Sequence, residues 1–527
     1  MKKLSKFIII AAVAMSGCSK SYFDINQNPN SPSSASVDLV LANALKTTAG
    51  FQVAGAGIAG GGIFPTISEW MNFWAPSGSY ALNSSDGASY KETTDLADNT
   101  WTAMYRNLED YDYVEKTATA NNQYFYIAAA KTMKALVYQQ LVDLFNNVPY
   151  TEALKGTANL LPKYDKGKDI YEDLSTQLDA AVTLFKRADA TAVLAEDDLF
   201  GTPAGGTAAN ENSNWAKFAN TLRLRLLIRQ TEVPGRAAYI QTEVNKIIAN
   251  GSGFLTIDAA VNPGYSNSSG KTNPFWGFSY SLAGSYTQDF WRAGKFIVTF
   301  AAAHNDPRIK YWYAPLANGN VVGTVVGSTS NPTGGLSSVF GPGVLQSVSQ
   351  SAVILSASES YFMQAEAGLR GYLANSPSAL FKSAVLANFT YLGAKYPPIK
   401  SLVAPFPDSI TYTVAQSAAI YTSQNDKETN YDACVTFNEK LNCINRQKFL
   451  AMNSITPLEA YDDYRRLFYL GLPFTTSVPL SVHPNIDVPG TIPTRFLYPT
   501  SEYQTNLANV SGEGTINYHT SKVWWQQ

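Results

Sequence analysis

Three segments of the chain place tryptophan and tyrosine rings beside amide and carboxylate side chains. A flat ring can stack on the apolar face of a sugar while polar neighbours hydrogen-bond to its hydroxyls, and apolar walls with a few polar groups are the general form of a ligand site. Residues 273–291 are the segment that we favour as the ligand site, and residues 69–80 are a second candidate. The third segment, 311–313, is better explained by a role in the core. The alternative to ligand contact, for every ring, is packing in the hydrophobic core. The predicted ligand contacts are Trp70, Trp74, Trp276, Tyr280, Tyr286, Asp289 and Trp291.

Residue patterns typical of catalysis are absent from the sequence. The three histidines show no metal-binding spacing, and no nucleophile elbow, phosphate-binding loop or dinucleotide fingerprint occurs. The acidic pair 462–463 is followed by two arginines, which favours ion pairs along a helix over acid–base chemistry. We therefore expect no enzyme, no catalytic residue, no metal site and no cofactor. A structural calcium ion stays open, because the loop carboxylates of Asp258 and Asp289 are suitable ligands.

The N-terminus has the layout of an export signal. Three lysines precede an apolar run that is too short to span a bilayer, and small residues then lead to Cys18. This arrangement resembles the lipobox of bacterial lipoproteins, in which the cysteine is acylated. The prediction is a lipoprotein signal peptide over 1–17, lipidation at Cys18 and a polar tether over 18–36, with palmitate as the type of anchor. The alternative is a secreted protein in which Cys18 is incidental.

The other two cysteines, Cys434 and Cys443, form an even pair once Cys18 is assigned to lipid. In an extracytoplasmic protein such a pair favours a disulfide, which would close a short loop. Two free thiols or a metal-binding pair are the alternatives.

Composition excludes some partners. The net charge is −2, so no global field attracts nucleic acid. Charged residues make up 15% of the chain and aromatic residues 13%, a balance that suits contact with carbohydrate or peptide better than phosphate chemistry.

Hydrophobic periodicity predicts a mainly α-helical fold. Apolar residues recur at three- and four-residue steps over 124–145, 215–229, 358–372 and 437–452, and Asp169 is expected to cap a further helix. Paired helices of this length resemble tetratricopeptide-like units and would form a scaffold. Residues of about 250–350 are instead rich in Gly, Ser and Asn, which predicts a loop-rich subdomain with short β-hairpins. A single domain is expected over 37–527.

Five segments in a fixed order resemble one family, the SusD/RagB-like nutrient-binding outer-membrane lipoproteins, and within it the second SusD-like subgroup. Individually each match is weak, but together they span nearly the whole mature chain. They are LVDLFNNVPYTEAL (141–154), NDPR with Tyr311 (305–311), ESYFMQAEA with Arg370-Gly371 (359–371), the stretch from QKFLA through EAY to Arg465-Arg466 (447–466), and IPTRFLYP with Glu502 and Asn506 (492–506).

The resemblance implies a helical scaffold with a loop-rich ligand face. It also implies a protein that is lipid-anchored in the outer membrane, faces the cell exterior, and captures glycan or oligopeptide nutrients for a SusC-type TonB-dependent transporter. The motif residues Asp143, Arg370, Arg465 and Arg466 are interpreted as polar links between helices. The alternatives from other classes are a surface-anchored glycan hydrolase and a purely structural surface lipoprotein.

Overall fold

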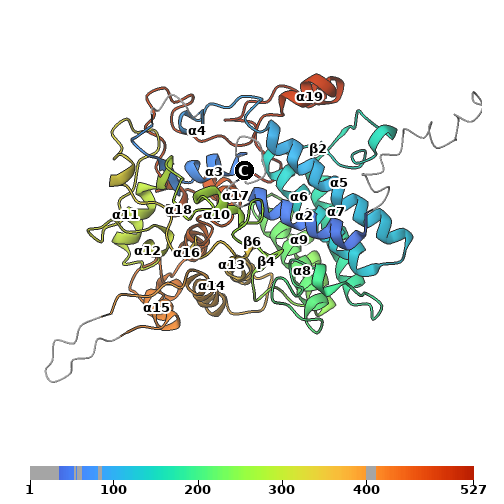
Figure 1. Ribbon diagram of the computed structural model, residues 1–527, viewed down its shortest axis with the longest axis horizontal. Helices are drawn as coiled ribbons and strands as arrows, with labels where there is room; N and C mark the ends of the chain where they lie inside the picture. The colour runs from blue at the N-terminus through green and yellow to red at the C-terminus, as the bar shows by residue number, and fades with distance from the viewer. Residues whose placement is uncertain (1–34, 53–54, 56–61, 81–85, 399–410) are drawn as a thin grey trace, which may run out of the picture.

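The computed structural model describes residues 35–52, 55, 62–80, 86–398 and 411–527. Helices dominate this part of the chain, as predicted (Figure 1). The predicted signal peptide, Cys18 and most of the tether lie outside the described residues. Among the residues described, no helix combines the length and hydrophobicity that a membrane span requires.

The N-terminal half is a row of helices in which each packs against the next in sequence (Figure 1). The central helix of the row, α6, is buried along nearly its whole length, and Ala128, Ala129 and Ala130 are fully buried. Such small side chains allow the neighbouring helices to approach on both sides. The row consists of α2 (Val37–Gln52), α5 (Asp98–Ala120), α6 (Tyr124–Phe145), α7 (Gly167–Phe185), α8 (Glu211–Arg229) and α9 (Ala237–Asn250).

One predicted boundary in this row is wrong. Asp169 does not cap a helix; it lies in the first turn of α7, which begins two residues earlier at Gly167. An acidic side chain is favourable there because it faces the positive end of the helix dipole.

A second group of helices forms the C-terminal half, and α13 joins it to α8. Their starts follow ordinary capping rules. Ser356 accepts a hydrogen bond from the Glu359 amide, while Thr413 and Thr436 form capping boxes with Gln416 and Glu439. The group consists of α13 (Ala357–Leu369), α14 (Pro377–Leu392), α15 (Val414–Tyr421), α16 (Phe437–Ala451) and α17 (Pro457–Leu467).

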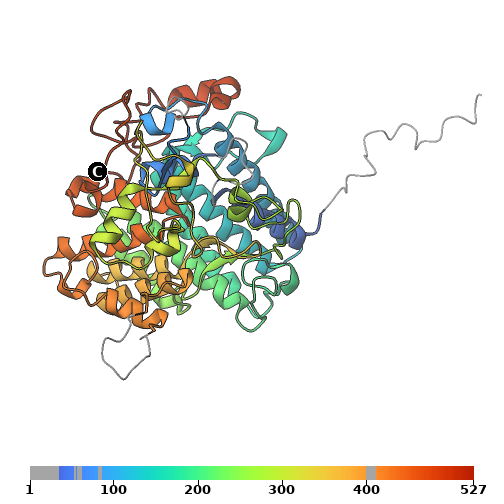
Figure 2. The ribbon, with the colours of Figure 1, turned by 60° about the vertical axis from the view of Figure 1, so that its left-hand side comes forward.

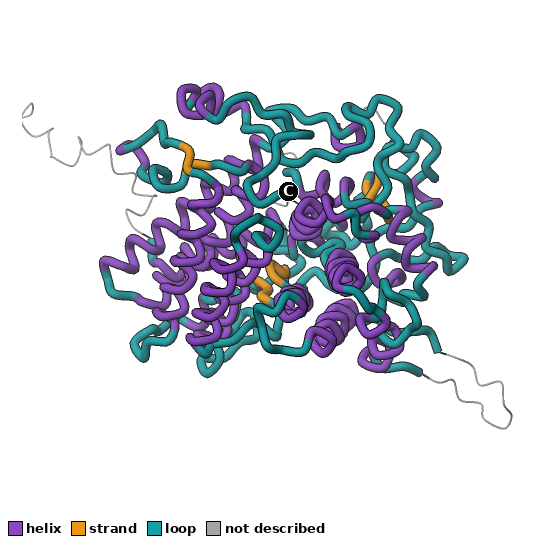
Figure 3. The backbone as a smooth tube through the Cα atoms, turned by 180° about the vertical axis from the view of Figure 1, so that it is seen from behind, coloured by secondary structure: helices purple, strands orange, loops and turns teal. Residues whose placement is uncertain are grey.

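Short helices and 3₁₀ turns connect these groups. The region of 250–350 is loop-rich, as predicted, and Figure 3 shows how much of one side of the molecule is loop. The short helices are α3 (Phe64–Trp70), α4 (Asp86–Ser89), α10 (Pro274–Ser279), α11 (Lys295–Ala303), α12 (Ile309–Trp312), α18 (Pro473–Thr476), α19 (Thr500–Thr505) and α20 (Leu507–Gly512), and the 3₁₀ turns are η4 (Gly156–Ala158), η5 (Leu194–Glu196), η6 (Gly334–Leu336), η7 (Tyr431–Ala433) and η8 (Phe468–Leu470).

The strands are short and pair in twos, all antiparallel. Two of the three pairs join distant segments rather than forming the local hairpins expected. Within 250–350, the bridge between Tyr280 and Tyr286 marks one tight local reversal. The pairs are β1 (Trp74–Pro76) with β5 (Trp291–Ala293), β2 (Val148–Pro149) with β3 (Tyr164–Asp165), and β4 (Ala259–Val261) with β6 (Ala352–Leu355).

Buried ion pairs connect the two groups of helices. Arg229 on α8 contacts Glu459 at 2.5 Å and Asp462 at 2.9 Å on α17. Arg466 contacts Glu366 on α13 at 2.7 Å. All of these side chains are almost completely buried, so each charge depends on its partners.

The motif residues Asp143, Arg370, Arg465 and Arg466 serve as the polar links predicted for them. Arg465 donates to the Asp143 carbonyl at 2.8 Å, and Arg370, at the end of α13, pairs with Glu232 just beyond α8. Asp143 also accepts from the indole N–H of Trp525 at 2.8 Å. The C-terminal segment thereby returns to α6, and Figure 2 shows this segment, in red, across one end of the molecule.

Candidate functional site

The favoured segment begins with a capped helical turn. The Asn273 side chain accepts hydrogen bonds from the amides of Phe275 (2.9 Å) and Trp276 (3.0 Å), and it donates to the Gln350 carbonyl at 2.8 Å. Pro274 occupies the first position of α10, where its missing N–H costs nothing. The turn directs Phe275 into the core and leaves Trp276 half-buried.

The structure brings three of the predicted rings together. Trp276 and Tyr280 stack with ring centroids 4.4 Å apart and planes 18° apart. Tyr280 also contacts Tyr286 edge to face at 5.1 Å, beside the backbone bridge that joins these two residues. All three are partly exposed, so the stack meets solvent.

A second group of rings lies at the far end of the same segment. Trp291 packs perpendicular to Phe290 at 4.7 Å, and Phe290 contacts Tyr80 at 5.2 Å. Tyr80 is 43% exposed, and Trp291 is half-buried at the start of β5. We call the two groups together the aromatic surface; it consists of Tyr80, Trp276, Tyr280, Tyr286, Phe290 and Trp291.

The aromatic surface has an exposed carboxylate beside it. The Asp289 side chain is 72% exposed and lies 3.5 Å from the guanidinium of Arg292. Arg292 itself is buried and donates to the carbonyls of Gln288 and Trp291, which fixes the backbone that carries Asp289. The carboxylate is therefore held at the surface as a hydrogen-bond acceptor.

Two predicted ligand contacts, Trp70 and Trp74, belong to the core instead. Trp70 is 1% exposed, donates to the Gly87 carbonyl at 3.0 Å and stacks on Phe496. Trp74 is 2% exposed, donates to Ser454 at 2.9 Å and lies parallel to Phe275. Their N–H groups are satisfied and their faces covered, so no face remains for a ligand. In the third segment Trp312 and Tyr313 are fully buried, as expected.

The predicted disulfide is not formed, since Cys434 and Cys443 are both free and buried. The Cys434 thiol donates to the Lys427 carbonyl at 3.4 Å. A hydrogen bond from Cys443 lowers the pKa of Cys434, and burial raises the pKa of Cys443. The two thiols are thus neighbours, and neither is bridged in this structure.

The two carboxylates considered for calcium have separate roles. Asp258 accepts from the Ala357 amide at 2.8 Å at the start of α13, whereas Asp289 lies beside Arg292. Within the described residues, no three His, Cys, Asp or Glu side chains gather as a metal site would require.

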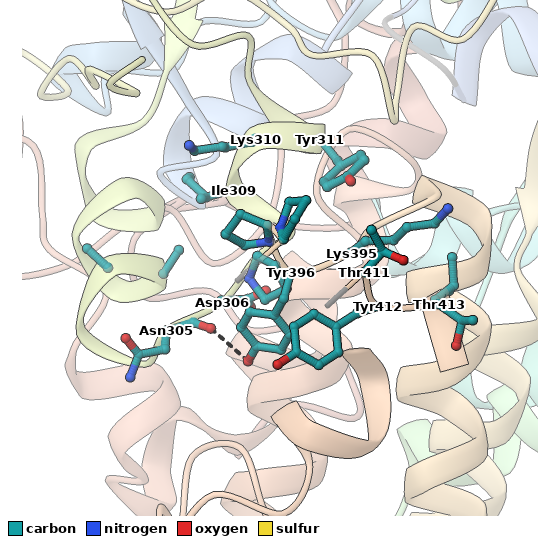
Figure 4. A pocket seen from close by; sticks show the side chains of 16 residues that line it. Asn305, Asp306, Ile309, Lys310, Tyr311, Lys395, Tyr396, Thr411, Tyr412 and Thr413 are labelled. Atoms are coloured by element: carbon teal, nitrogen blue, oxygen red, sulfur yellow. Dashed lines mark hydrogen bonds between the residues drawn. The ribbon is translucent and has the colours of Figure 1, made fainter. Parts of the chain in front are cut away.

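Sequence reasoning missed a cavity of about 910 Å³ beside α12. Its walls are the end of α11, the residues of the NDPR motif, and the segments 395–398 and 411–414 (Figure 4). The motif was visible in the sequence, but no spacing indicated that a segment ninety residues later faces it. Among the residues of the three aromatic segments, Tyr311 alone lines this cavity.

Comparisons with known proteins agree with the fold. The family model described as starch-binding and associating with the outer membrane, SusD-like, matches residues 29–499. No curated protein matches this sequence.

Several solved structures share the whole fold. A chitin-binding protein is 24% identical with a TM-score of 0.67, over 92% of this chain and 99% of that one. A chitin-binding SusD homologue from Flavobacterium johnsoniae is 20% identical with a TM-score of 0.68, and the match covers 92% of this chain and 98% of that one. A SusD/RagB family protein from Bacteroides thetaiotaomicron is 21% identical with a TM-score of 0.68, and the match covers 93% of this chain and 99% of that one. The chain therefore belongs to the SusD-like family of outer-membrane-associated binding proteins.

Proposed function

We propose that this protein binds glycans at the aromatic surface and delivers them, chemically unchanged, to a SusC-type TonB-dependent transporter. The observation that carries the proposal is the partly exposed stack of Trp276 and Tyr280, on the same segment as the exposed Asp289 carboxylate. Rings of this kind cover the apolar face of a pyranose, and a nearby acceptor pairs with its hydroxyls. Two proteins of the same fold that are named for chitin binding support a glycan over other ligands.

Calorimetric titration tests the binding step. Chitin oligosaccharides and starch oligosaccharides are the first two series to compare, because the similar structures and the family description name these polymers. We expect saturable binding of at least one series, with affinity that rises with chain length until the aromatic surface is covered. A glycan that is hydrolysed during the titration would support the hydrolase alternative instead.

The anchoring and delivery steps need a separate experiment. The proposal includes acylation of Cys18 and exposure at the outer face of the outer membrane. We expect the protein to carry lipid in the native membrane and to co-purify with a TonB-dependent transporter from detergent-solubilised outer membranes. A Cys18→Ala variant should be released from the membrane fraction. Intact binding without any co-purifying transporter would contradict delivery while leaving glycan capture in place.

A further inference from the structure

The loop between β2 and β3 turns two neighbouring leucines towards solvent. Leu160 is 72% exposed and Leu161 is 55% exposed. The Asn509 side chain donates to the Leu161 carbonyl at 3.0 Å, so α20 adjoins the loop, and α20 carries another exposed leucine, Leu507. A single exposed leucine is ordinary on a protein surface, but adjacent leucines with a third on the adjoining segment need a reason.

The loop is fixed from within, so its leucines are held in this position. The pairing of β2 with β3 closes its base. The Asp165 carboxylate accepts from the Thr151 amide at 2.8 Å, and the Glu152 carboxylate accepts from the Lys163 amide at 3.1 Å. Both carboxylates of the loop are therefore used to hold its backbone. A loop held in this way loses little conformational freedom when a partner covers it.

The exposed charges of the loop are positive. Residues 150–166 contain three lysines and two carboxylates, and all three lysines are exposed, whereas both carboxylates are partly buried. Lys163 pairs with Glu152 at 3.4 Å, but an ion pair this exposed holds its lysine only weakly. Lys155 and Lys166 are the other two. The leucines therefore lie among ammonium groups that attract negative charge.

The loop also lies beside the point where the described chain begins. The Tyr113 hydroxyl on α5 donates to the Ala35 carbonyl at 2.8 Å. One turn further along α5, Lys116 donates to the Leu154 carbonyl of the loop at 3.2 Å. The segment that leads back to Cys18, the residue proposed to carry lipid, therefore leaves the fold on the face that carries the loop. That segment reaches at most about 60 Å when fully extended, so the membrane is close to this face.

The composition of the loop favours a lipid surface over a protein partner. Protein interfaces are enriched in tyrosine, tryptophan and arginine, and lysine is depleted from them. Leucines among exposed lysines are instead typical of segments that lie in a membrane interface. There the apolar side chains enter the boundary of the acyl chains, and the ammonium groups contact anionic headgroups. The long lysine stems allow both contacts at once.

We propose that residues 155–163 bind the surface of an anionic lipid membrane, with Leu160 and Leu161 at the acyl boundary and Lys155 and Lys163 against the headgroup phosphates. The loop is then a second membrane contact besides the lipid at Cys18, and it determines which face of the protein is turned to the membrane. The aromatic surface stays free, because β2 and α10 lie well apart in Figure 1. The proposal rests on the proposed anchoring for its place in the cell, but lipid binding by the loop is measurable without an anchor.

Vesicle binding by the unlipidated chain tests the proposal. The chain from Ser19 onward keeps every described residue and carries neither the predicted signal peptide nor the lipid. The probes are vesicles of phosphatidylcholine alone and vesicles of equal parts phosphatidylcholine and phosphatidylglycerol, compared by co-sedimentation. We expect about tenfold tighter binding to the anionic vesicles in low salt, and the difference should shrink at high salt because exposed charges are screened.

Two double variants separate the apolar contribution from the charged one. Leu160→Asn/Leu161→Asn should weaken binding to the anionic vesicles by at least about tenfold. Lys155→Gln/Lys163→Gln should remove most of the preference for anionic over neutral vesicles. All four side chains are exposed, so urea unfolding of both variants should match that of the wild type.

Matched substitutions elsewhere locate the effect. Leu336→Asn replaces a leucine that is 63% exposed, and Lys310→Gln replaces an exposed lysine; neither should change vesicle binding. The proposal is overturned if the chain binds neither kind of vesicle, or if Leu160→Asn/Leu161→Asn binds them as the wild type does. Loss of a co-purifying transporter in that variant, with vesicle binding unchanged, would make the loop a protein interface and overturn the proposal as well. A failure of Cys18 acylation would alter none of these vesicle results.

Discussion

At the scale of single residues, the same side chain has opposite uses in this protein. Trp74 and Trp276 are both indoles in aromatic-rich segments, yet Trp74 is sealed in the core and Trp276 meets solvent. The difference lies in their partners, because Trp74 donates to Ser454 while Trp276 stacks on Tyr280. Only the second arrangement leaves an aromatic face near the surface.

The first prediction concerns that exposed ring. Trp276→Ala should weaken glycan binding by at least about 1 kcal/mol, the free energy that an aromatic stacking contact usually contributes. The free energy of unfolding should change little. Calorimetry gives the affinity and urea unfolding gives the stability. Phe468→Ala is the matched control, since Phe468 is an aromatic side chain, 47% exposed, outside the aromatic surface. Equal affinity in the wild type and Trp276→Ala would exclude this ring as a contact.

A second residue-scale prediction concerns a buried acid at the start of the aromatic segment 69–80. Glu69 is 1% exposed, and burial raises its pKa from 4.5 to about 8. Because the folded pKa lies above the unfolded one, the stability that the protonated form provides is complete below pH 4.5 and is lost as pH rises through about 8.

Glu69→Gln should therefore stabilise the protein at pH 8 and above, by about 2–4 kcal/mol, and change little near pH 4.5. Urea unfolding at the two pH values measures this. Glu109→Gln removes a carboxylate from an exposed position on α5 and should show no such pH dependence. A Glu69→Gln effect that is the same at both pH values would contradict the assignment.

At the scale of elements, the aromatic surface depends on one short capped turn. Asn273 holds α10 through two accepted bonds and reaches across to Gln350. The helix is too short to be stable by itself, so its position comes from the cap and from the core contacts of Phe275. The orientation of Trp276 follows from this turn.

Asn273→Ala should cost about 1 kcal/mol of stability and also weaken glycan binding, although Asn273 is buried and cannot touch a ligand. Asn273→Asp keeps the acceptor for the two amides and should recover most of the binding. Unfolding curves and titrations of both variants check this. If Asn273→Ala lost stability but kept full affinity, the turn would not be what positions Trp276.

The elements themselves were largely predictable from the sequence, while their contacts were not. The long helices, such as 124–145 and 437–451, follow from their apolar periodicity, and the loop-rich middle follows from its Gly, Ser and Asn content. The burial of Trp70 depends on Phe496, more than four hundred residues away, and no local pattern encodes such a contact. The cavity at Tyr396 was missed for the same reason.

At the scale of the whole molecule, buried charges connect helices that are far apart in sequence. Burial alone would raise the pKa of Glu366, but Arg466 and Arg370 lower it to about 2. Because the folded pKa lies below the unfolded value of 4.5, this carboxylate stabilises the fold above pH 4.5, and the contribution is lost as pH falls towards 2.

The free energy of unfolding should therefore fall between about pH 4.5 and pH 2. Glu366→Gln should cost about 3–5 kcal/mol at pH 7, because it leaves Arg466 buried with one fewer partner, and its deficit should already be smaller at pH 3. Urea unfolding at pH 7 and pH 3 measures both. A deficit that stays constant over this range would show that the ion pair does not set the acid sensitivity.

The anchoring of residues 273–292 has a consequence for engineering. The segment is fixed at one end by Asn273 and at the other by the buried Arg292, and most of the rings between these points lie outside the ion-paired scaffold. The part that we propose binds glycan therefore lies between two fixed points, with Phe275 packed in the core between them. Replacing the residues between the two anchors, α10 included, with the equivalent segment of another member should transfer sugar preference while the long helices and their charges stay untouched.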